Sequence, residues 1–219
     1  MKTIAKPLTA LILLVGMGLA STAQADLIDR VFAVYDTDRN ISWLKDANYA
    51  QTSGYDADGQ MTWATAKTWA EGLNIGGFTD WRLPTTLQPD ATCGIQDSGN
   101  SYGYNCKGSE LGHLFYTEGG LTQSQNINSS VVLSNLFINM QNSIYWSSTE
   151  FAPNPLSAWM FVTDDGFQYF DGKAGFNHYA WAVRDGDVGA GSSVPEPGII
   201  GLMGIGALAW AGTWHKRRG

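Results

Sequence analysis

Two apolar segments, one near each end of the chain, confine the folded body to the residues between them. Two lysines precede the apolar run at residues 8–20, and the small residues of Ala23-Gln24-Ala25 follow it at a spacing that signal peptidase recognises. The run is short for a membrane span. We therefore expect residues 1–25 to be a signal peptide, cleaved by signal peptidase before Asp26, rather than a retained anchor.

The body between the two segments has about 170 residues, which suits one domain with its own core. The whole chain has a formal net charge of −7, and five of its 13 basic residues lie in the terminal segments, so the body is more acidic still. An acidic body disfavours nucleic acid and anionic polymers as partners. We expect one domain at residues 26–185, followed by a flexible, small-residue linker at 186–193.

The chain has two cysteines, Cys93 and Cys106, in the glycine- and asparagine-rich segment ATCGIQDSGNSYGYNCKG. In an exported chain such a pair is expected to form a disulfide, which stabilises a fold by about 2–4 kcal/mol. No histidine or third cysteine stands at the spacing of a metal site. We therefore predict a structural disulfide rather than free or metal-binding thiols.

Two short helices are predicted in the first half of the body. Thr62 fits the N-cap of a helix at residues 63–73, whose apolar side chains form one stripe, and Gly76-Gly77 is expected to end it. Ser109 is expected to cap a second helix that ends at Gly119-Gly120. The apolar side of this second helix consists of Leu111, Leu114 and Phe115.

After Asn142 the sequence changes to aromatic and β-branched runs, IYWSST, AWMFVT, FQYF and HYAWAVR. Asp164-Asp165-Gly166 and Asp171-Gly172 lie between these runs, as in β-hairpins, so we predict an antiparallel meander. The earlier runs VFAVYD and ISWL are expected to add strands. Two short helices packed on an antiparallel β-sheet make an α+β domain.

Seven blocks carry a family resemblance: ISWLKDAN, MTWATAKTWAEGL, GGFTDWRLPT, ELGHLF, YWSSTE, AWMFV and YAWAVR. In this order, over nearly the whole body, they resemble the DUF1566 family, also called the Lcl C-terminal domain family. The resemblance implies a C-type-lectin-like fold, related also to the formylglycine-generating enzymes. It further implies an exported or surface-exposed protein, and it assigns no activity.

We interpret the family-motif residues as structural. Trp81 and Leu83 can fill the core, Arg82 can pair with a carboxylate or bind backbone carbonyls, and Pro84 stops a strand. Ser147, Ser148 and Thr149 are the alternative candidates for nucleophiles, but His113 and His178 are isolated from them in the sequence, so no catalytic residue is expected. The motif residues with expected structural roles are Trp81, Arg82, Leu83, Pro84, Tyr145, Trp146, Ser147, Ser148 and Arg184.

Three acidic segments are candidates for calcium sites. Asp36-x-Asp38-x-Asn40 begins like an EF-hand loop, but Ile41 stands in place of the turn glycine and Ala47 in place of the bidentate glutamate. Asp56-x-Asp58-Gly59 and Asp164-Asp165-Gly166 are read as turns, with oxygen ligands for calcium as the alternative. We expect no metal site and no cofactor.

Three functions are compatible with the body. We expect a non-catalytic adhesion or interaction module. The first alternative is a polysaccharide-binding module. Seven tryptophans and many tyrosines lie in the body, and an exposed aromatic face can stack on sugar rings. Most of these rings must nonetheless lie in the core. The second is an enzyme of the formylglycine-generating type. Such enzymes use a cysteine pair and a metal, a role that a disulfide between Cys93 and Cys106 does not allow.

The C-terminal segment has three parts. Val194-Pro195-Glu196-Pro197 is followed by an uncharged run at residues 198–214 and then by the basic residues Lys216, Arg217 and Arg218. We expect residues 198–214 to form a transmembrane helix, since about 17 residues at 1.5 Å each reach the lower limit for crossing a bilayer and basic residues stay on the cytoplasmic side.

This tripartite end resembles the PEP-CTERM sorting signal of Gram-negative bacteria, which an exosortase recognises. The resemblance implies that this membrane protease cuts near the motif at residues 194–219. The body is then expected to pass from the inner membrane to the cell envelope, the cell surface or the extracellular polysaccharide matrix. A permanent C-terminal membrane anchor is the alternative.

Overall fold

The structure is a computed structural model that describes residues 27–189. The expected signal peptide at 1–25, the end of the linker at 186–193 and the expected transmembrane helix at 198–214 lie outside the described residues. Within 27–189, no helix has the length and apolar character needed to cross a membrane.

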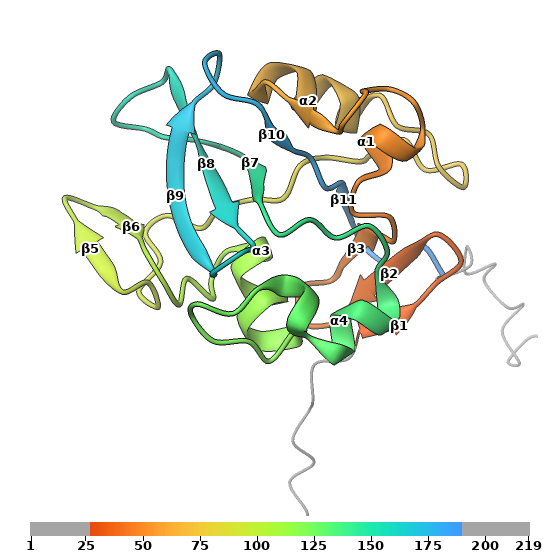
Figure 1. Cartoon of the computed structure of the whole chain (residues 1–219), viewed down its shortest axis with the longest axis horizontal. Coiled ribbons are helices and arrows are strands. Elements are labelled where there is room, and N and C mark those ends of the chain that lie inside the picture. Colours follow the sequence, from red (N-terminus) through yellow and green to blue (C-terminus); the bar gives the residue numbers. More distant parts are fainter. Residues whose placement is uncertain (1–26, 190–219) are drawn as a thin grey trace, which may run out of the picture.

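The two ends of the described chain meet in one antiparallel sheet of four strands, in the order β1-β2-β3-β11. Its strands are β1 (Leu27–Asp29), β2 (Ala33–Asp36), β3 (Ile41–Leu44) and β11 (Val183–Asp185). The strands predicted from VFAVYD and ISWL are thus confirmed. Because β11 pairs with β3, the last strand closes the domain against its first hairpin (Figure 1).

A second, five-stranded sheet has the order β4-β10-β7-β8-β9. Its strands are β4 (Gln60–Met61), β7 (Ile144–Glu150), β8 (Ser157–Val162), β9 (Phe167–Gly172) and β10 (His178–Tyr179). Strands β7, β8 and β9 pair in antiparallel order, so the core of the predicted meander is confirmed. Its second turn uses Gly166 with a positive φ of 88°, which favours glycine.

The last predicted run, HYAWAVR, does not extend this meander. Its first part, β10, pairs in parallel with β7 through Tyr179 and Tyr145, whereas its last part, β11, belongs to the other sheet. Asp171-Gly172 is the end of β9 and not a hairpin turn. Between β10 and β11 the chain passes from one sheet to the other, and the indole N–H of Trp181 donates to the carbonyl of Leu44, 2.7 Å away, on the first sheet. Tertiary burial thus divides a run that local pattern reads as one strand.

Helix α2 (Trp63–Glu71) begins where the sequence predicts. Thr62 is its N-cap, and the side-chain oxygen of Thr62 accepts from the amide of Thr65. The helix ends earlier than predicted, because Gly72 is its C-cap. Gly76-Gly77 instead forms a separate tight turn with φ values of 64° and 87°, between the bridged residues Ile75 and Phe78.

Removing the N-cap of α2 is expected to destabilise the domain measurably. Thr62→Ala is expected to lower the free energy of unfolding by about 1 kcal/mol, because one amide of the first helical turn loses its acceptor. Thr62→Ser keeps the hydroxyl and is expected to stay close to wild type. Urea denaturation followed by tryptophan fluorescence checks both variants, and equal losses in the two would show that the hydroxyl does not cap α2.

The second predicted helix is present but has an unexpected form. It comprises α3 (Glu110–His113) followed directly by a π-helical turn, η1 (Leu114–Glu118), and Gly119 lies at its end. Its predicted apolar residues Leu111, Leu114 and Phe115 are buried. Ser109 occupies the N-cap position, but its hydroxyl accepts from the amide of Leu87 instead of capping the helix. That part of the prediction is wrong, because a neighbouring loop competes for the same oxygen.

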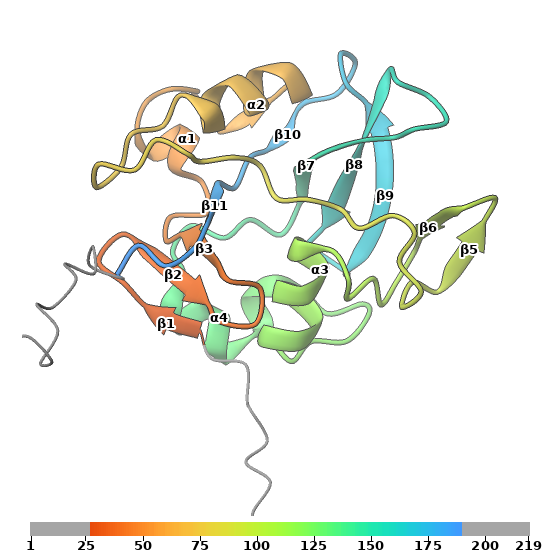
Figure 2. The ribbon, with the colours of Figure 1, turned by 180° about the vertical axis from the view of Figure 1, so that it is seen from behind.

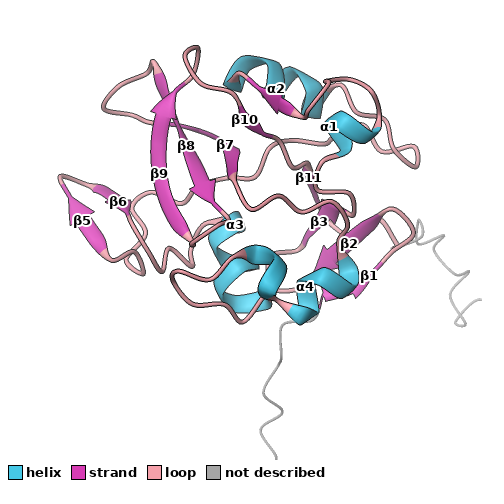
Figure 3. Ribbon diagram, in the orientation of Figure 1, coloured by secondary structure: helices cyan, strands magenta, loops and turns pink. Residues whose placement is uncertain are grey.

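Further short elements were not predicted. They are α1 (Tyr49–Thr52), η2 (Ile127–Ser129), α4 (Val131–Leu136), β5 (Ile95–Asp97) and β6 (Asn100–Tyr102). Each has six residues or fewer, too few to show a hydrophobic period. Figure 3 shows the resulting α+β domain, in which short helices surround the two sheets, and Figure 2 gives the view from behind.

The core is unusually rich in tryptophan. All seven tryptophans of the described chain are at most 8 % exposed. Trp181 contacts the rings of Trp43, Tyr145 and Phe137 at centroid distances of 5.0–5.6 Å. These contacts join residues from both sheets, so one aromatic cluster holds the sheets together. The tryptophans are therefore core residues and cannot form an exposed binding face.

Cys93 and Cys106 form the predicted disulfide. Both cysteines are buried, and the small hairpin of β5 and β6 lies between them in the sequence. Gly103, just after β6, makes an isolated bridge with Gln168 of β9. The disulfide loop thus places this hairpin against the outer edge of the second sheet.

Candidate functional site

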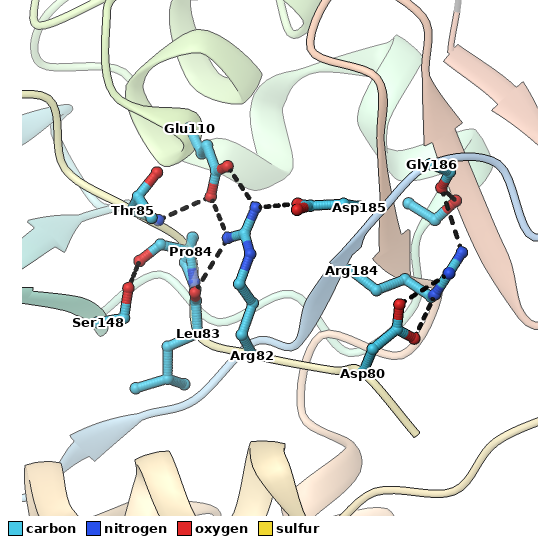
Figure 4. Close-up of polar contacts among 11 residues, drawn as sticks. Asp80, Arg82, Leu83, Pro84, Thr85, Glu110, Ser148, Arg184, Asp185 and Gly186 are labelled. Carbon is cyan, nitrogen blue, oxygen red and sulfur yellow. Dashed lines mark hydrogen bonds and ion pairs between the residues drawn. The ribbon is translucent and has the colours of Figure 1, made fainter. Parts of the chain in front are cut away.

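The GGFTDWRLPT motif centres on Arg82, whose side chain is fully engaged (Figure 4). Its guanidinium donates two parallel bonds of 2.8 Å to the two carboxylate oxygens of Glu110 and one bond of 2.6 Å to Asp185. It also donates to the carbonyl of Leu83 at 3.2 Å. Arg82 thereby connects the motif with α3 and with β11.

The electrostatics favour a permanent ion pair at Arg82. Burial disfavours the charged guanidinium, but the hydrogen bonds and charge of Glu110, followed by those of Asp185, outweigh burial and raise the pKa of Arg82. Glu110 also accepts from the amide of Thr85 at 2.6 Å. Because every one of these groups has a partner, the pair supports the fold and leaves no free acid or base.

Arg184 forms a second pair beside the first. Its Nε and Nη2 donate to the two carboxylate oxygens of Asp80 at 2.8 and 2.9 Å (Figure 4). Its guanidinium also lies 4.3 Å from the ring centre of Phe78. The hydrogen bonds from Arg184 lower the pKa of the Asp80 carboxyl. Arg184 thus ties β11 to the segment that precedes Arg82.

The remaining motif residues lie in the core or join backbone segments. Trp81, Leu83, Tyr145 and Trp146 are buried. The amide and the hydroxyl of Ser148 donate to the carbonyl of Pro84, at 2.8 and 3.3 Å.

The candidate nucleophiles have backbone partners. The hydroxyl of Ser147 accepts from the amide of Thr149, and the hydroxyl of Thr149 donates to the carbonyl of Thr86. These contacts join β7 to the motif loop at residues 84–86. They place none of the three hydroxyls against an imidazole among the described residues.

Two of the three candidate calcium segments form turns in the structure. One carboxylate oxygen of Asp56 accepts from the amides of Asp58 and Gly59. One oxygen of Asp165 accepts from the amide of Phe167, and its other oxygen accepts from the hydroxyl of Tyr104 at 3.1 Å. In both segments the carboxylate holds its own turn together.

A partly exposed chain of aromatic rings runs along the outer strand β9. We call it the aromatic surface, and it consists of Tyr102, Tyr104, Phe151, Phe167, Tyr169 and Phe170. Each ring contacts at least one other at 3.7–6.0 Å between centroids, and Phe170 stacks on Phe151 at 3.7 Å. Figures 1 and 2 place β9 and the β5–β6 hairpin side by side at one edge of the molecule. In the sequence an exposed aromatic face is only an alternative to a buried aromatic core, and the sequence does not identify its members.

One group of side chains in residues 27–189 is suited to hold a metal ion: Asp36, His113 and Glu118. Imidazole Nε2 of His113 lies 3.0 Å from a carboxylate oxygen of Glu118 and 3.8 Å from one of Asp36, and all three residues are buried. The sequence predicts no metal site for two reasons. Asp36 is 77 positions from His113, and residues at the spacing of His113 and Glu118 do not share a face of an α-helix.

The other histidine of the described domain forms a similar pair. Nε2 of His178 lies 3.1 Å from a carboxylate oxygen of Asp171. Burial lowers the pKa of His178, and the hydrogen bond to Asp171 only partly opposes this effect. Both histidines are thus isolated in sequence but paired with acids in the fold.

Two family models match the chain. That of the Lcl C-terminal domain matches residues 32–184, and that of the PEP-CTERM protein-sorting motif matches residues 193–218. No curated protein and no solved structure gives a significant match.

Proposed function

Because the chain belongs to the Lcl C-terminal domain family and ends in a PEP-CTERM protein-sorting motif, we propose that it is a non-catalytic adhesion or interaction module of the cell surface. The sorting motif marks the protein as exported, associated with the cell envelope or surface, and processed by an exosortase, a membrane protease. The interaction role is supported by the aromatic surface, which leaves large rings partly exposed on a domain whose polar motif residues are paired internally.

The proposed route has three steps. Signal peptidase cleaves before Asp26, and residues 198–214 hold the precursor in the inner membrane as a helix. The exosortase then cuts near Pro195-Glu196-Pro197 and releases the body to the surface or to the extracellular matrix. The tripartite sequence of residues 194–219 supports this order of events.

We further propose that the α+β domain is C-type-lectin-like. The family membership and the short helices around two small sheets support this classification. The enzymatic alternative, a formylglycine-generating type, requires reactive cysteines, whereas the disulfide between Cys93 and Cys106 leaves the described domain without a free thiol.

Polysaccharide is the partner that we favour, and one observation carries this choice. Phe167, Tyr169 and Phe170 follow one another along an edge strand, and ring contacts extend the row on both sides. A row of flat apolar rings suits stacking on the faces of successive sugars, and carboxylates and amides nearby can bind hydroxyl groups. The exposed Asp164 lies in the turn between β8 and β9, directly before this row.

Removing one ring from the aromatic surface tests the proposal. Tyr169→Ala is expected to weaken binding to the extracellular polysaccharide of the producing cells by about tenfold, because loss of one stacking ring costs about 1.4 kcal/mol. Binding is measured by co-sedimentation with the purified polymer over a range of polymer concentrations. Tyr55→Ala is the matched control, because Tyr55 is an exposed tyrosine, 52 % accessible, that lies outside the aromatic surface.

Two outcomes contradict polysaccharide binding at this surface. One is the absence of saturable binding by the wild-type protein. The other is an equal loss in Tyr169→Ala and Tyr55→Ala, which would indicate nonspecific adsorption. If the wild type instead captures a surface protein and Tyr169→Ala does not, the interaction module stands with a different partner.

A further inference from the structure

The three side chains of this cluster come from two segments that are far apart in the sequence and meet in the fold: Asp36 from one, His113 and Glu118 from the other. Asp36 is the last residue of β2, His113 ends α3, and Glu118 ends the π-helical turn η1. One oxygen of Asp36 accepts from the amide of Arg39 at 3.0 Å, which orients the carboxylate. The contact between β2 and η1 thus brings a nitrogen and two carboxylates together, all within 4.8 Å of one another.

The π-helical turn makes this arrangement possible. Residues five apart on an α-helix lie about 140° apart around its axis, so His113 and Glu118 would point in different directions. In η1 the amide of Gly119 bonds to the carbonyl of Leu114, five residues earlier, at 2.8 Å. This wider turn places Glu118 beside His113, with 3.0 Å between their side-chain atoms. Such π-turns occur frequently at functional sites.

The cluster is incomplete as a hydrogen-bonded network. Asp36 is 1 % exposed, and its Oδ2 has no hydrogen-bond partner. The Nε2 of His113 faces this oxygen, but at 3.8 Å it is too far away to donate to it, and it is already 3.0 Å from Glu118. A buried carboxylate oxygen without a donor is costly, so it points to a missing cation.

We propose that Asp36, His113 and Glu118 bind one divalent transition-metal ion, of which zinc is the representative, and that the ion joins β2 to η1. This site is separate from the aromatic surface and does not depend on the function proposed above. When the ion is bound by a neutral imidazole and two carboxylates, its two positive charges balance the charges of the two carboxylates.

The distances suit such an ion. Ligand atoms bound to zinc at about 2.0–2.1 Å in a tetrahedron are about 3.4 Å apart. The two separations from Nε2 of His113, 3.0 Å to Glu118 and 3.8 Å to Asp36, lie on either side of that value. The third separation, between the carboxylate oxygens of Asp36 and Glu118, is within 4.8 Å, so rotation of the two carboxylates can bring the donors to a tetrahedral spacing. The fourth position of a tetrahedral ion remains for a water molecule or another oxygen.

The donor set also selects among metals. Imidazole with two carboxylates suits zinc, manganese or iron, whereas calcium takes six to eight oxygen ligands. All three ligands are buried, with side-chain exposures of 1 %, 8 % and 4 %. A metal in this position is therefore structural, since no open face is available to a substrate.

Zinc binding by the full chain tests the proposal. The protein, purified in detergent with an affinity tag that contains no histidine, is stripped with a chelator and titrated with zinc chloride. We expect one zinc per chain after gel filtration, measured by elemental analysis, and a melting temperature several degrees higher than that of the stripped protein. Calcium chloride at the same concentration is expected to produce neither effect.

Two variants locate the ion, and one serves as a control. Asp36→Asn and His113→Gln are expected to weaken zinc binding by at least the roughly 10–100-fold that loss of an outer-shell partner costs a metal site. His178→Gln is the matched control, because it removes the other buried histidine with a carboxylate about 3 Å away, and it is expected to keep one zinc.

The outcomes are decisive even if a variant folds poorly. Asp36→Asn keeps the shape of the side chain and removes an unpartnered charge, so its stripped form is expected to melt no lower than the stripped wild type. Absence of stoichiometric zinc in the wild type would overturn the proposal without any variant. Zinc bound equally well by the wild type and Asp36→Asn, or lost only in His178→Gln, would also overturn it.

Discussion

Replacing Arg82 by alanine is expected to lower the free energy of unfolding by about 3 kcal/mol, because it leaves the carboxylate of Glu110 without its charged partner. Glu110 has only 11 % of its side chain exposed and accepts two parallel bonds from Arg82. Urea denaturation, monitored by the fluorescence of the buried tryptophans, measures the loss.

Two further variants separate this pair from surface charges. Lys67→Ala removes an exposed pair with Glu71, 3.7 Å long, and is expected to cost less than about 0.5 kcal/mol. Arg82→Lys is expected to recover only part of the loss, because an ammonium group keeps the charge but cannot form two parallel bonds. A loss in Arg82→Ala no larger than that in Lys67→Ala would show that the motif arginine does not stabilise the domain.

Replacing Glu196 by alanine is expected to abolish exosortase processing, so that intact precursor accumulates in the membrane. Glu196 is the charged residue of the Pro-Glu-Pro sequence. The flanking Pro195 and Pro197 favour an extended backbone and remove two amide donors, which suits presentation in a protease cleft. Fractionation of cells followed by intact-mass measurement shows whether the chain retains Trp214 and the basic residues after it.

Ser192→Ala is the control for this experiment, since Ser192 precedes the matched motif by one residue. It is expected to be processed like the wild type. If the mature wild-type protein still carries residues 198–218 in a cell with an active exosortase, the segment is a permanent anchor. Processing of Glu196→Ala at the wild-type rate would mean that the enzyme does not read the glutamate.

Local pattern predicted those elements that are stabilised by their own residues. Helix α2 starts at Thr62 because the threonine caps it and because Trp63, Ala66, Trp69 and Ala70 share one buried stripe. The β7–β8–β9 meander follows aromatic runs and a turn with glycine. The pairing of Cys93 with Cys106 needed only the count of cysteines in an exported chain.

Predictions failed where a distant segment competed for a group. The hydroxyl of Ser109 accepts from the amide of Leu87 instead of capping its own helix. The two ends of the run HYAWAVR belong to different sheets, because Trp181 in its middle is buried in the core between the sheets. The glutamate partner of Arg82 stands 28 positions away, so the sequence indicated that Arg82 needs a carboxylate but not which one.

The sequence by itself determined the sorting motif, the disulfide and the α+β class. It also predicted an export segment at residues 1–25 and structural roles for the motif residues. These features depend on short-range patterns or on simple composition, which a linear chain displays directly. The tertiary structure alone decided which rings remain exposed beside β9 and that Asp36 meets His113 and Glu118. The exposed rings and the cluster of three side chains both depend on contacts between segments that are distant in the sequence. The cluster depends also on the π-helical turn η1, and no residue in ELGHLFYTE indicates that this turn is wider than an α-helical one.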